Sequence, residues 1–452
     1  MPLEDWMAAI IDYRGKTPRK TTSGIPLVTA KIVKNGRIEA PEEFIAEADY
    51  DDWMRRGIPE PGDVVLTTEA PLGEVAQLDG TKIALAQRII TLRGKPDLLD
   101  NTYLRFALQS GPIQEQLRGR ASGSTVSGIK QSELRKLTLR FPPVDEQRRV
   151  AAVLVTLDDK IDVNRRINQT LEAMAQAIFK SWFVDFDPVK AKIAAIEQGQ
   201  DPLRVAMRAI SGKTDTELDQ LPREYYDQLA VTAALFPDAM KESELGDIPK
   251  GWTHGVLGDV CSFTAGSAFK PEHQGSTEGD YPFIKVSDMN LAGNEVFIQS
   301  ANNYVSKAQQ SEMKAKLHPL GATVFAKIGV ALISNRRRLL TTPTIIDNNL
   351  MSASPVESKS GAYFLYSMLS TIDFNTLVSG TALPYINVSD LKKIPIVRPP
   401  HDVGFAFERK ASSIFSMMQA LAAQSSTLAD TRDNLLPKLM SGEVEFSETL
   451  EG

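Results

Sequence analysis

The sequence is poor in the residues that most often build catalytic, metal or covalent sites. It has one cysteine, Cys261, so no internal disulfide can form, and this usage fits a reducing compartment. The four histidines show neither HxH nor HExxH spacing, which argues against a zinc site. No GxxxxGK[ST] loop occurs, so we expect no ATP hydrolysis by this chain.

Other absences narrow the class further. No run approaches the ~18 apolar residues of a membrane span, and the start, MPLEDWMAAI, carries acids where a signal peptide needs basic residues. The two Pro-Pro pairs read FPPV and RPPH, so the (D/N)PP(Y/F) motif of adenine methyltransferases is missing too. We expect a cytoplasmic protein that contacts no membrane and binds no cofactor of its own.

The length and charge distribution of the chain point to several domains. A chain of 452 residues with 42% hydrophobic content exceeds a single core and predicts two to four domains. Residues 1–143 carry a net charge of +1 and residues 246–400 of +2, whereas the remainder carries −9. The acid therefore lies outside two slightly basic regions, which is compatible with two DNA-facing surfaces.

These two regions are copies of one another. SGSTVSGIKQSELRKLTLRFPP begins at Ser122, and SGTALPYINVSDLKKIPIVRPP begins at Ser379; eight of the 22 positions are identical without a gap. GDVVL and YLRFALQS in the first half likewise correspond to GATVF and YFLYSMLS in the second. Short β-like runs (63–67, 83–92, 394–397) alternate with short helices (101–117, 362–369), which predicts one α+β domain present twice, over 1–143 and 246–400.

Each copy runs into a long helix, predicted over 144–185 and 401–441. Apolar residues alternate at spacings of three and four, the period of a coiled coil. A shift of 257 residues places one seam on the other, so we expect the two helices to pack on each other, with the polar Asn164 and Asn168 in mid-seam. If they pack antiparallel, the two domains lie at opposite ends of a rigid rod. The predicted seam residues are Val150, Leu154, Leu157, Ile161, Leu171, Ile178, Phe407, Ile414, Leu421, Leu428 and Leu435. An acidic connector, 186–245, contains helical patches at 189–197, 202–210 and 224–235.

The candidates for DNA contact are basic and hydroxyl residues in turn-forming loops, where cations neutralise phosphates and an arginine fork can bind guanine. For each of them, a solvated surface charge is the competing explanation. The candidates are Arg14, Lys16, Thr17, Arg19, Lys31, Arg88, Ser124, Thr125, Lys270, Lys285, Lys327, Arg336, Arg337, Arg338 and Thr381.

Two alternatives compete with a DNA-reading protein. Asp347 with Glu357 and Lys359 imitates the D…ExK arrangement of Mg²⁺ nucleases, although SASPVESKSG is rich in Ser, Pro and Gly and predicts an exposed loop. The second alternative is a structural hub without DNA affinity.

In their order along the chain, several segments resemble the specificity subunit of a type I restriction–modification system. The resemblance covers almost the whole chain, but after Pro400 the second copy reads HDVGFAFERK where the first has VDEQRRVAAV. The segments are RGKTP (14–18), GSTVSGIKQSELRKLTLRFPPVDEQ (123–147), LDDKID (157–162), LEAMAQAIFKSWFVDFDPV (171–189), ELGDIPKGW (244–252) and LLPKLMSGEV (435–444).

The resemblance implies a non-catalytic subunit with two target-recognition domains, each binding one half of a split site on double-stranded DNA. It implies that the two long helices form an antiparallel coiled coil that sets the length of the unread spacer. It also implies that two methyltransferase subunits and restriction subunits are the protein partners. S-adenosylmethionine, ATP and Mg²⁺ are then expected in those partner subunits.

Overall fold

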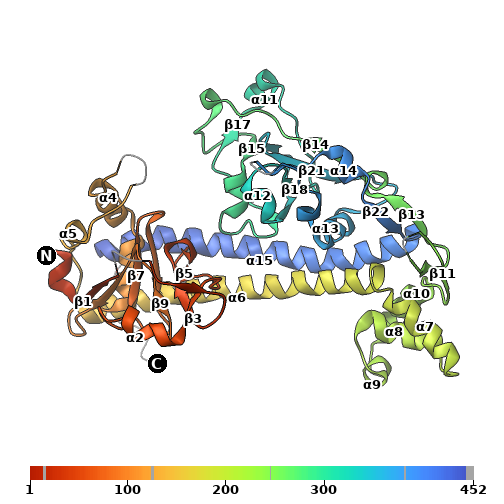
Figure 1. Cartoon of the computed structure of the whole chain (residues 1–452), viewed down its shortest axis with the longest axis horizontal. Coiled ribbons are helices and arrows are strands. Elements are labelled where there is room, and N and C mark those ends of the chain that lie inside the picture. The colour runs from red at the N-terminus through yellow and green to blue at the C-terminus, as the bar shows by residue number, and fades with distance from the viewer. Residues whose placement is uncertain (14–16, 124–126, 245, 381–382, 444–452) are drawn as a thin grey trace. The chain divides into compact units, whose positions relative to one another are not determined.

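A computed structural model describes residues 1–13, 17–123, 127–244, 246–380 and 383–443. The chain forms two compact units: unit 1 comprises Met1–Asp162 with Thr427–Gly452, and unit 2 comprises Val163–Ser426. Each unit contains one α+β module together with part of both long helices (Figure 1).

The main sheet of unit 1 has four antiparallel strands in the order β1-β10-β7-β8. These are β1 (Met7–Asp12), β7 (Val64–Thr68), β8 (Leu72–Gln77) and β10 (Ile89–Gly94). All five residues of β7 are buried. Because side chains alternate along a strand, Val64 and Leu66 enter one core and Val65 enters another. The sheet is therefore covered on both faces.

A smaller sheet and several short helices complete the module of unit 1. The small sheet has the order β2-β6-β3-β9, and β3 pairs with β9 in parallel. Its strands are β2 (Lys20–Thr21), β3 (Ile25–Val28), β6 (Phe44–Ile45) and β9 (Ala84–Leu85); β4 (Val33–Lys34) and β5 (Arg37–Ile38) form a separate hairpin. The helices are α1 (Leu3–Trp6), α2 (Tyr50–Trp53), α3 (Asn101–Gln109), α4 (Gly111–Gly119) and α5 (Gln131–Leu134).

Unit 2 repeats this topology. Its main sheet has the order β14-β21-β18-β19-β16, in which the first four strands correspond to β1, β10, β7 and β8. Its small sheet, β17-β15-β20, repeats the parallel pair as β15 with β20. The strands are β14 (Cys261–Ala265), β15 (Tyr281–Ile284), β16 (Phe297–Ile298), β17 (Tyr304–Val305), β18 (Thr323–Ala326), β19 (Arg337–Leu340), β20 (Ile345–Ile346) and β21 (Leu350–Pro355). The duplication expected from the sequence is thus present in the fold.

The remaining elements of unit 2 include the connector. Its helices are α7 (Asp187–Glu197), α8 (Pro202–Ser211), α9 (Asp215–Asp219) and α10 (Arg223–Ala234). Two small sheets pair β11 (Met240–Lys241) with β12 (Ile248–Pro249) and β13 (Thr253–Val256) with β22 (Pro395–Arg398). The module helices are α11 (Lys307–Met313), α12 (Val330–Ile333), α13 (Ala362–Thr371) and α14 (Val388–Lys392).

The expectations for two segments, among others, were wrong. The helix predicted over 101–117 is two helices, because Pro112 occupies the first turn of α4 and starts a new helix there. The segment SASPVESKSG was expected to be an exposed loop, but its first four residues extend β21, where Ser352 is fully buried. Pairing of β21 with β14 and β18 outweighs the low strand propensity of Ser and Pro in that segment.

The long helices are α6 (Val144–Phe183) and α15 (His401–Ser441), which lie side by side (Figure 1). In unit 2, Asn164 donates to Gln424 Oε1 (2.8 Å) and Asn168 donates to the Met418 carbonyl (3.1 Å). In unit 1, Asp158 accepts from Arg432 at 2.7 Å. In unit 2, the later position on α6 thus meets the earlier position on α15, so the helices run antiparallel there. No helix within the described residues is long and apolar enough to span a bilayer.

Candidate nucleic-acid interface

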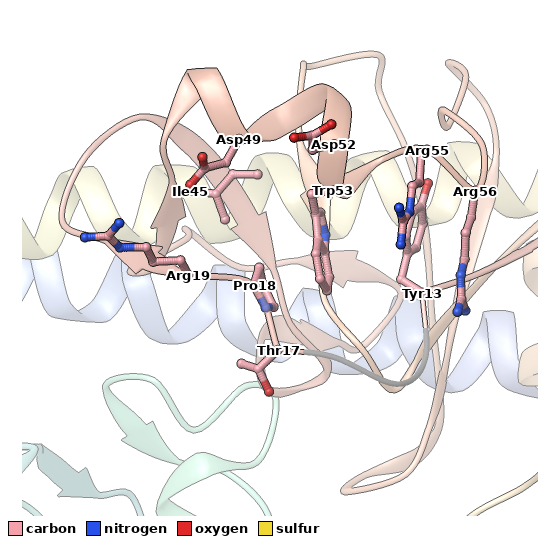
Figure 2. Close-up of a pocket in the computed structure, with 10 residues that line it drawn as sticks. All are labelled: Tyr13, Thr17, Pro18, Arg19, Ile45, Asp49, Asp52, Trp53, Arg55 and Arg56. Atoms are coloured by element: carbon pink, nitrogen blue, oxygen red, sulfur yellow. The ribbon is translucent and has the colours of Figure 1, made fainter.

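A cleft of about 570 Å³ opens on the surface of unit 1 (Figure 2). It lies between the segment that follows β1 and the segment that contains α2. Its lining residues are Tyr13, Thr17, Pro18, Arg19, Ile45, Asp49, Asp52, Trp53, Arg55 and Arg56. Two of them, Thr17 and Arg19, belong to the basic loop that the sequence predicts as a DNA contact.

Two aromatic side chains that line this cleft, Tyr13 and Trp53, are held in place by stacking and hydrogen bonds. The rings of Tyr13 and Trp53 stack with centroids 6.4 Å apart. Trp53 Nε1 donates to the Leu85 carbonyl at 3.0 Å, and the Tyr13 hydroxyl donates to the carbonyl of Gly57. Burial, together with the nearby Tyr50, raises the pKa of Tyr13, so its hydroxyl remains a donor at neutral pH. The α2 segment is therefore held to the core from both sides.

The charged groups around the cleft remain open to solvent. Arg56 donates to the Asp12 carbonyl at 2.8 Å. Arg19, Arg55 and Asp52 are exposed, and none of the three makes a side-chain hydrogen bond or ion pair with another residue of the described ranges. Donors and acceptors thus face the same opening without neutralising each other.

The other predicted DNA-contact residues that the structure describes in unit 1 form ion pairs within the protein. Lys31 is exposed with a long ion pair to Glu42 (3.9 Å), and Arg88, at a φ of 75°, pairs with Glu69 at 3.6 Å. Both pairs are solvent-exposed, and such pairs contribute little to stability. The predicted contacts Arg14, Lys16, Ser124 and Thr125 lie outside the described residues.

In unit 2, most predicted contacts have local partners. Lys270 pairs with Glu272 at 3.7 Å, and Lys327 is half-buried. Lys285 donates to Gln274 Oε1, and its ammonium lies 5.1 Å above the Phe269 ring. Arg336 is exposed and donates to Asn290 Oδ1, whereas Thr381 lies outside the described residues.

Arg337 has to be removed from the candidate set, and Arg338 is only partly available. Arg337 is buried, donates to the carbonyls of Asn335 and Ile372 and stacks 4.1 Å from the Phe374 ring. Burial lowers the pKa of Arg337 to about 10, so the group still carries its charge at neutral pH. Arg338 is half-buried and donates to the Met289 carbonyl at 3.1 and 3.2 Å.

Of the eleven predicted seam residues, none is exposed. Val150, Leu154 and Phe407 are buried, and the other eight are half-buried. Asn164 is fully buried in mid-seam, where it pairs with Gln424 and with Ser425 Oγ at 3.3 Å. In unit 1, Asp158 accepts from both Arg105 and Arg432 at 2.7 Å, which ties α3 to both long helices.

Comparison with known proteins identifies the family. The family model described as type I restriction modification DNA specificity domain matches residues 14–173 and again residues 249–428. These two matches cover most of the chain and follow its internal repeat. The chain belongs to the type I restriction–modification DNA specificity family.

Named members of this family align over much of their length. The chain is 34% identical over 325 residues to the HindI specificity subunit of Haemophilus influenzae, covering 68% of this chain and 69% of that protein. It is 26% identical over 429 residues to the MjaIX specificity subunit of Methanocaldococcus jannaschii, covering 94% and 88%. The crystal structure of an S subunit from M. genitalium matches over 99% of this chain and 96% of its own at 13% identity and a TM-score of 0.44.

The nuclease alternative does not fit this specificity-family chain. Asp347 and Glu357 lie beyond opposite ends of the six-residue β21, whose terminal residues are about 17 Å apart at ~3.3 Å per residue. Asp347 accepts from the backbone and side-chain nitrogens of Asn349, and burial raises the pKa of its carboxyl. In the described ranges, no three His, Cys, Asp or Glu side chains group as a metal site. The three residues therefore do not form one centre.

Sequence reasoning missed Asp52, Arg55 and Arg56 of the cleft. The available signal was the run YDDWMRRG, in which charged residues interrupt apolar ones that the fold buries: Tyr50 and Met54 are 6% and 2% exposed. A basic pair after a short helix has no motif of its own, so only the fold reveals that this pair shares a cleft with Arg19.

Proposed function

We propose that this chain is the non-catalytic DNA-recognition subunit of a type I restriction–modification complex and binds a bipartite target. Each module contacts one half-site, and the antiparallel helix pair sets the length of the spacer between them. The observation that carries the proposal is the duplicated topology: two modules with equivalent sheets and parallel strand pairs, within one specificity-family chain.

The helix contacts support a fixed spacer. Asn164 and Asn168 bind partners on α15, and a polar residue at a seam position favours one register over its alternatives. The Asp158 pairs with Arg105 and Arg432 are mostly shielded from water, so a register shift would leave buried charges unpaired. A helix pair with one preferred register can hold two reading modules at one separation.

The partners and cofactors follow from this role. Two methyltransferase subunits bind this chain and contribute S-adenosylmethionine and the adenine-methylating site. Restriction subunits contribute ATP- and Mg²⁺-dependent translocation and cleavage. The assembled complex acts on double-stranded DNA in the cytoplasm, where base contacts select the sequence and phosphate contacts position the protein.

A methylome tests the proposal directly. The chain is co-expressed with its methyltransferase subunit in a host free of adenine methylation, and modified adenines are mapped by single-molecule sequencing. Two short half-sites around a fixed degenerate gap are expected. A continuous motif, or none from an assembled complex, contradicts bipartite reading.

A structural hub without DNA affinity makes a different prediction. The affinity of the assembled complex for DNA should fall as the salt concentration rises. The logarithm of the binding constant, plotted against the logarithm of the salt concentration, should have a slope of about −0.9 per phosphate contacted. A hub would show no such slope.

A further inference from the structure

We propose that the cleft of unit 1 is a specificity-determining site, in which Arg55 and Asp52 contact base edges of one half-site and Arg19 contacts a phosphate. The inference rests on the proposed function, because it assigns a chemistry to one surface of a DNA-reading module. It adds Arg55 and Asp52, which lie outside the loops that sequence patterns single out.

The first argument is the chemical composition of the cleft. A surface that only neutralises phosphates needs cations, and an exposed carboxylate there would repel the backbone. Asp52 and Arg55 instead present an acceptor and a donor fork three residues apart on one rigid segment. The major-groove edge of a G·C pair offers the complement: guanine O6 and N7 accept from arginine, and cytosine N4 donates to a carboxylate.

The second argument is rigidity. A base-reading group has to be held within a fraction of an ångström, which requires an anchored scaffold. Tyr50, Trp53 and Met54 alternate with the charged residues and hold the segment to the core, with Trp53 bonded to Leu85. A Cβ on Gly57 would lie 3.0 Å from Ile11 Cδ1, so the chain packs tightly where it leaves the cleft. Figure 2 shows Arg55 and Arg56 on one side of Trp53 and Arg19 on the other.

The third argument is repetition. In unit 1, β6 pairs antiparallel with β3 and leads into α2; in unit 2, β17 pairs antiparallel with β15 in the same register and leads into α11. Two exposed cations follow each helix: Arg55 and Arg56 after α2, and Lys314 and Lys316 after α11. Neither lysine forms an ion pair with another residue of the ranges described. The same element thus offers unpaired cations in both modules, while the surrounding sequence differs.

The test is the methylated motif of variant complexes. Arg55→Ala and Asp52→Asn are each expected to relax the motif at one position of one half-site, lowering the preference for the wild-type base by about 5- to 150-fold. Arg55→Lys, which keeps the charge but loses the bidentate fork, should relax the same position. Lys314→Ala together with Lys316→Ala should alter the other half-site. Asp51→Asn, an exposed residue of α2 outside the cleft, is the matched control and should leave the motif unchanged.

The outcomes separate this inference from the function beneath it. A destabilised complex would methylate all of its sites less, so a change of base preference at a single position is not a folding effect. An unchanged motif in Arg55→Ala, Arg55→Lys and Asp52→Asn, from complexes that assemble like wild type, overturns the inference and leaves the proposed function intact. A wild-type complex without a bipartite motif overturns the proposed function itself. Arg19→Ala should reduce the salt slope by about one while preserving the motif.

Discussion

At the scale of single residues, the burial of His318 makes the stability of unit 2 depend on pH. Its side chain is fully buried, Nδ1 lies 2.7 Å from Ser352 Oγ, and Nε2 has no partner within the described ranges. Burial, and secondarily the charge of Lys316, lowers the pKa of His318 to about 4. The unfolded chain therefore binds this proton more readily than the folded one.

The folded pKa of His318 lies below its unfolded value of about 6.5, so its contribution to stability is full above that pH. This contribution should be lost as pH falls from about 6.5 to about 4, at a cost of roughly 3 kcal/mol. Urea unfolding of the full chain across this range measures it. His318→Gln should flatten the dependence of stability on pH, whereas His273→Gln, at a half-buried position, should keep it. A wild-type chain equally stable at both pH values contradicts the assignment.

The three arginines at 336–338 show what sequence alone can resolve at this scale. Loop chemistry predicted all three as DNA contacts, but β19 begins at Arg337, whose side chain is buried. Arg336 precedes the strand and is exposed, and alternation along the strand places Arg338 on the opposite face, where it is half-buried. The alternation of side chains along a strand could have distinguished Arg337 from the other two arginines if the strand had been predicted. The carbonyls that satisfy Arg337 come from Asn335 and Ile372, and that pairing depends on tertiary structure.

At the scale of elements, each long helix is fastened to its module by a different residue. Gln147 of α6 is fully buried, accepts from the Asp100 amide at 2.9 Å and donates to the carbonyls of Leu98 and Pro142 at 3.0 and 2.8 Å. The repeat places Gly404 at the equivalent position of α15. There Glu408, one turn later, accepts from the amides of Tyr363 and Phe364 at 3.1 and 2.8 Å.

Gln147→Ala should therefore lower the free energy of unfolding of unit 1 by roughly 2–4 kcal/mol, because three buried backbone groups lose their partner. Chemical denaturation of the full chain, followed by a probe in unit 1, measures the effect. Gln169→Ala, at an exposed position of the same helix, should change the stability by no more than about 0.5 kcal/mol. Equal effects of the two variants would show that the Gln147 bonds contribute nothing net.

Sequence patterns located the elements better than the contacts between them. The heptad seam predicted two long helices, and α6 and α15 span Val144–Phe183 and His401–Ser441, because apolar periodicity over many turns leaves few alternatives. The sequence shows that the second copy departs from the first after Pro400, but it does not show that Glu408 takes over the role of Gln147. Glu408 acts through backbone amides 44 and 45 residues away in the chain, and no local pattern encodes such a pair.

At the scale of the whole molecule, the proposed spacer role predicts a quantitative change. One heptad inserted into both α6, at Asn164, and α15, at Leu421, adds about 10.5 Å of helix at ~1.5 Å per residue and returns the seam to the same face. At ~3.4 Å per base pair, the gap between half-sites should lengthen by about three base pairs, while both half-sites keep their sequence. The methylome of the doubly extended chain measures the gap.

The matched control inserts the heptad into α6 alone. The Asn164 and Asn168 contacts with α15 would then fall out of register, and the Asp158–Arg432 pair could form only if α6 bulged. This chain should lose stability, and its complex should lose methylation, without gaining a new gap. If the double insertion altered the half-sites and left the gap unchanged, the modules would be positioned by something other than the helices.

Exchanging residues 1–143 for another such module should, by the same logic, replace one half-site and preserve the gap.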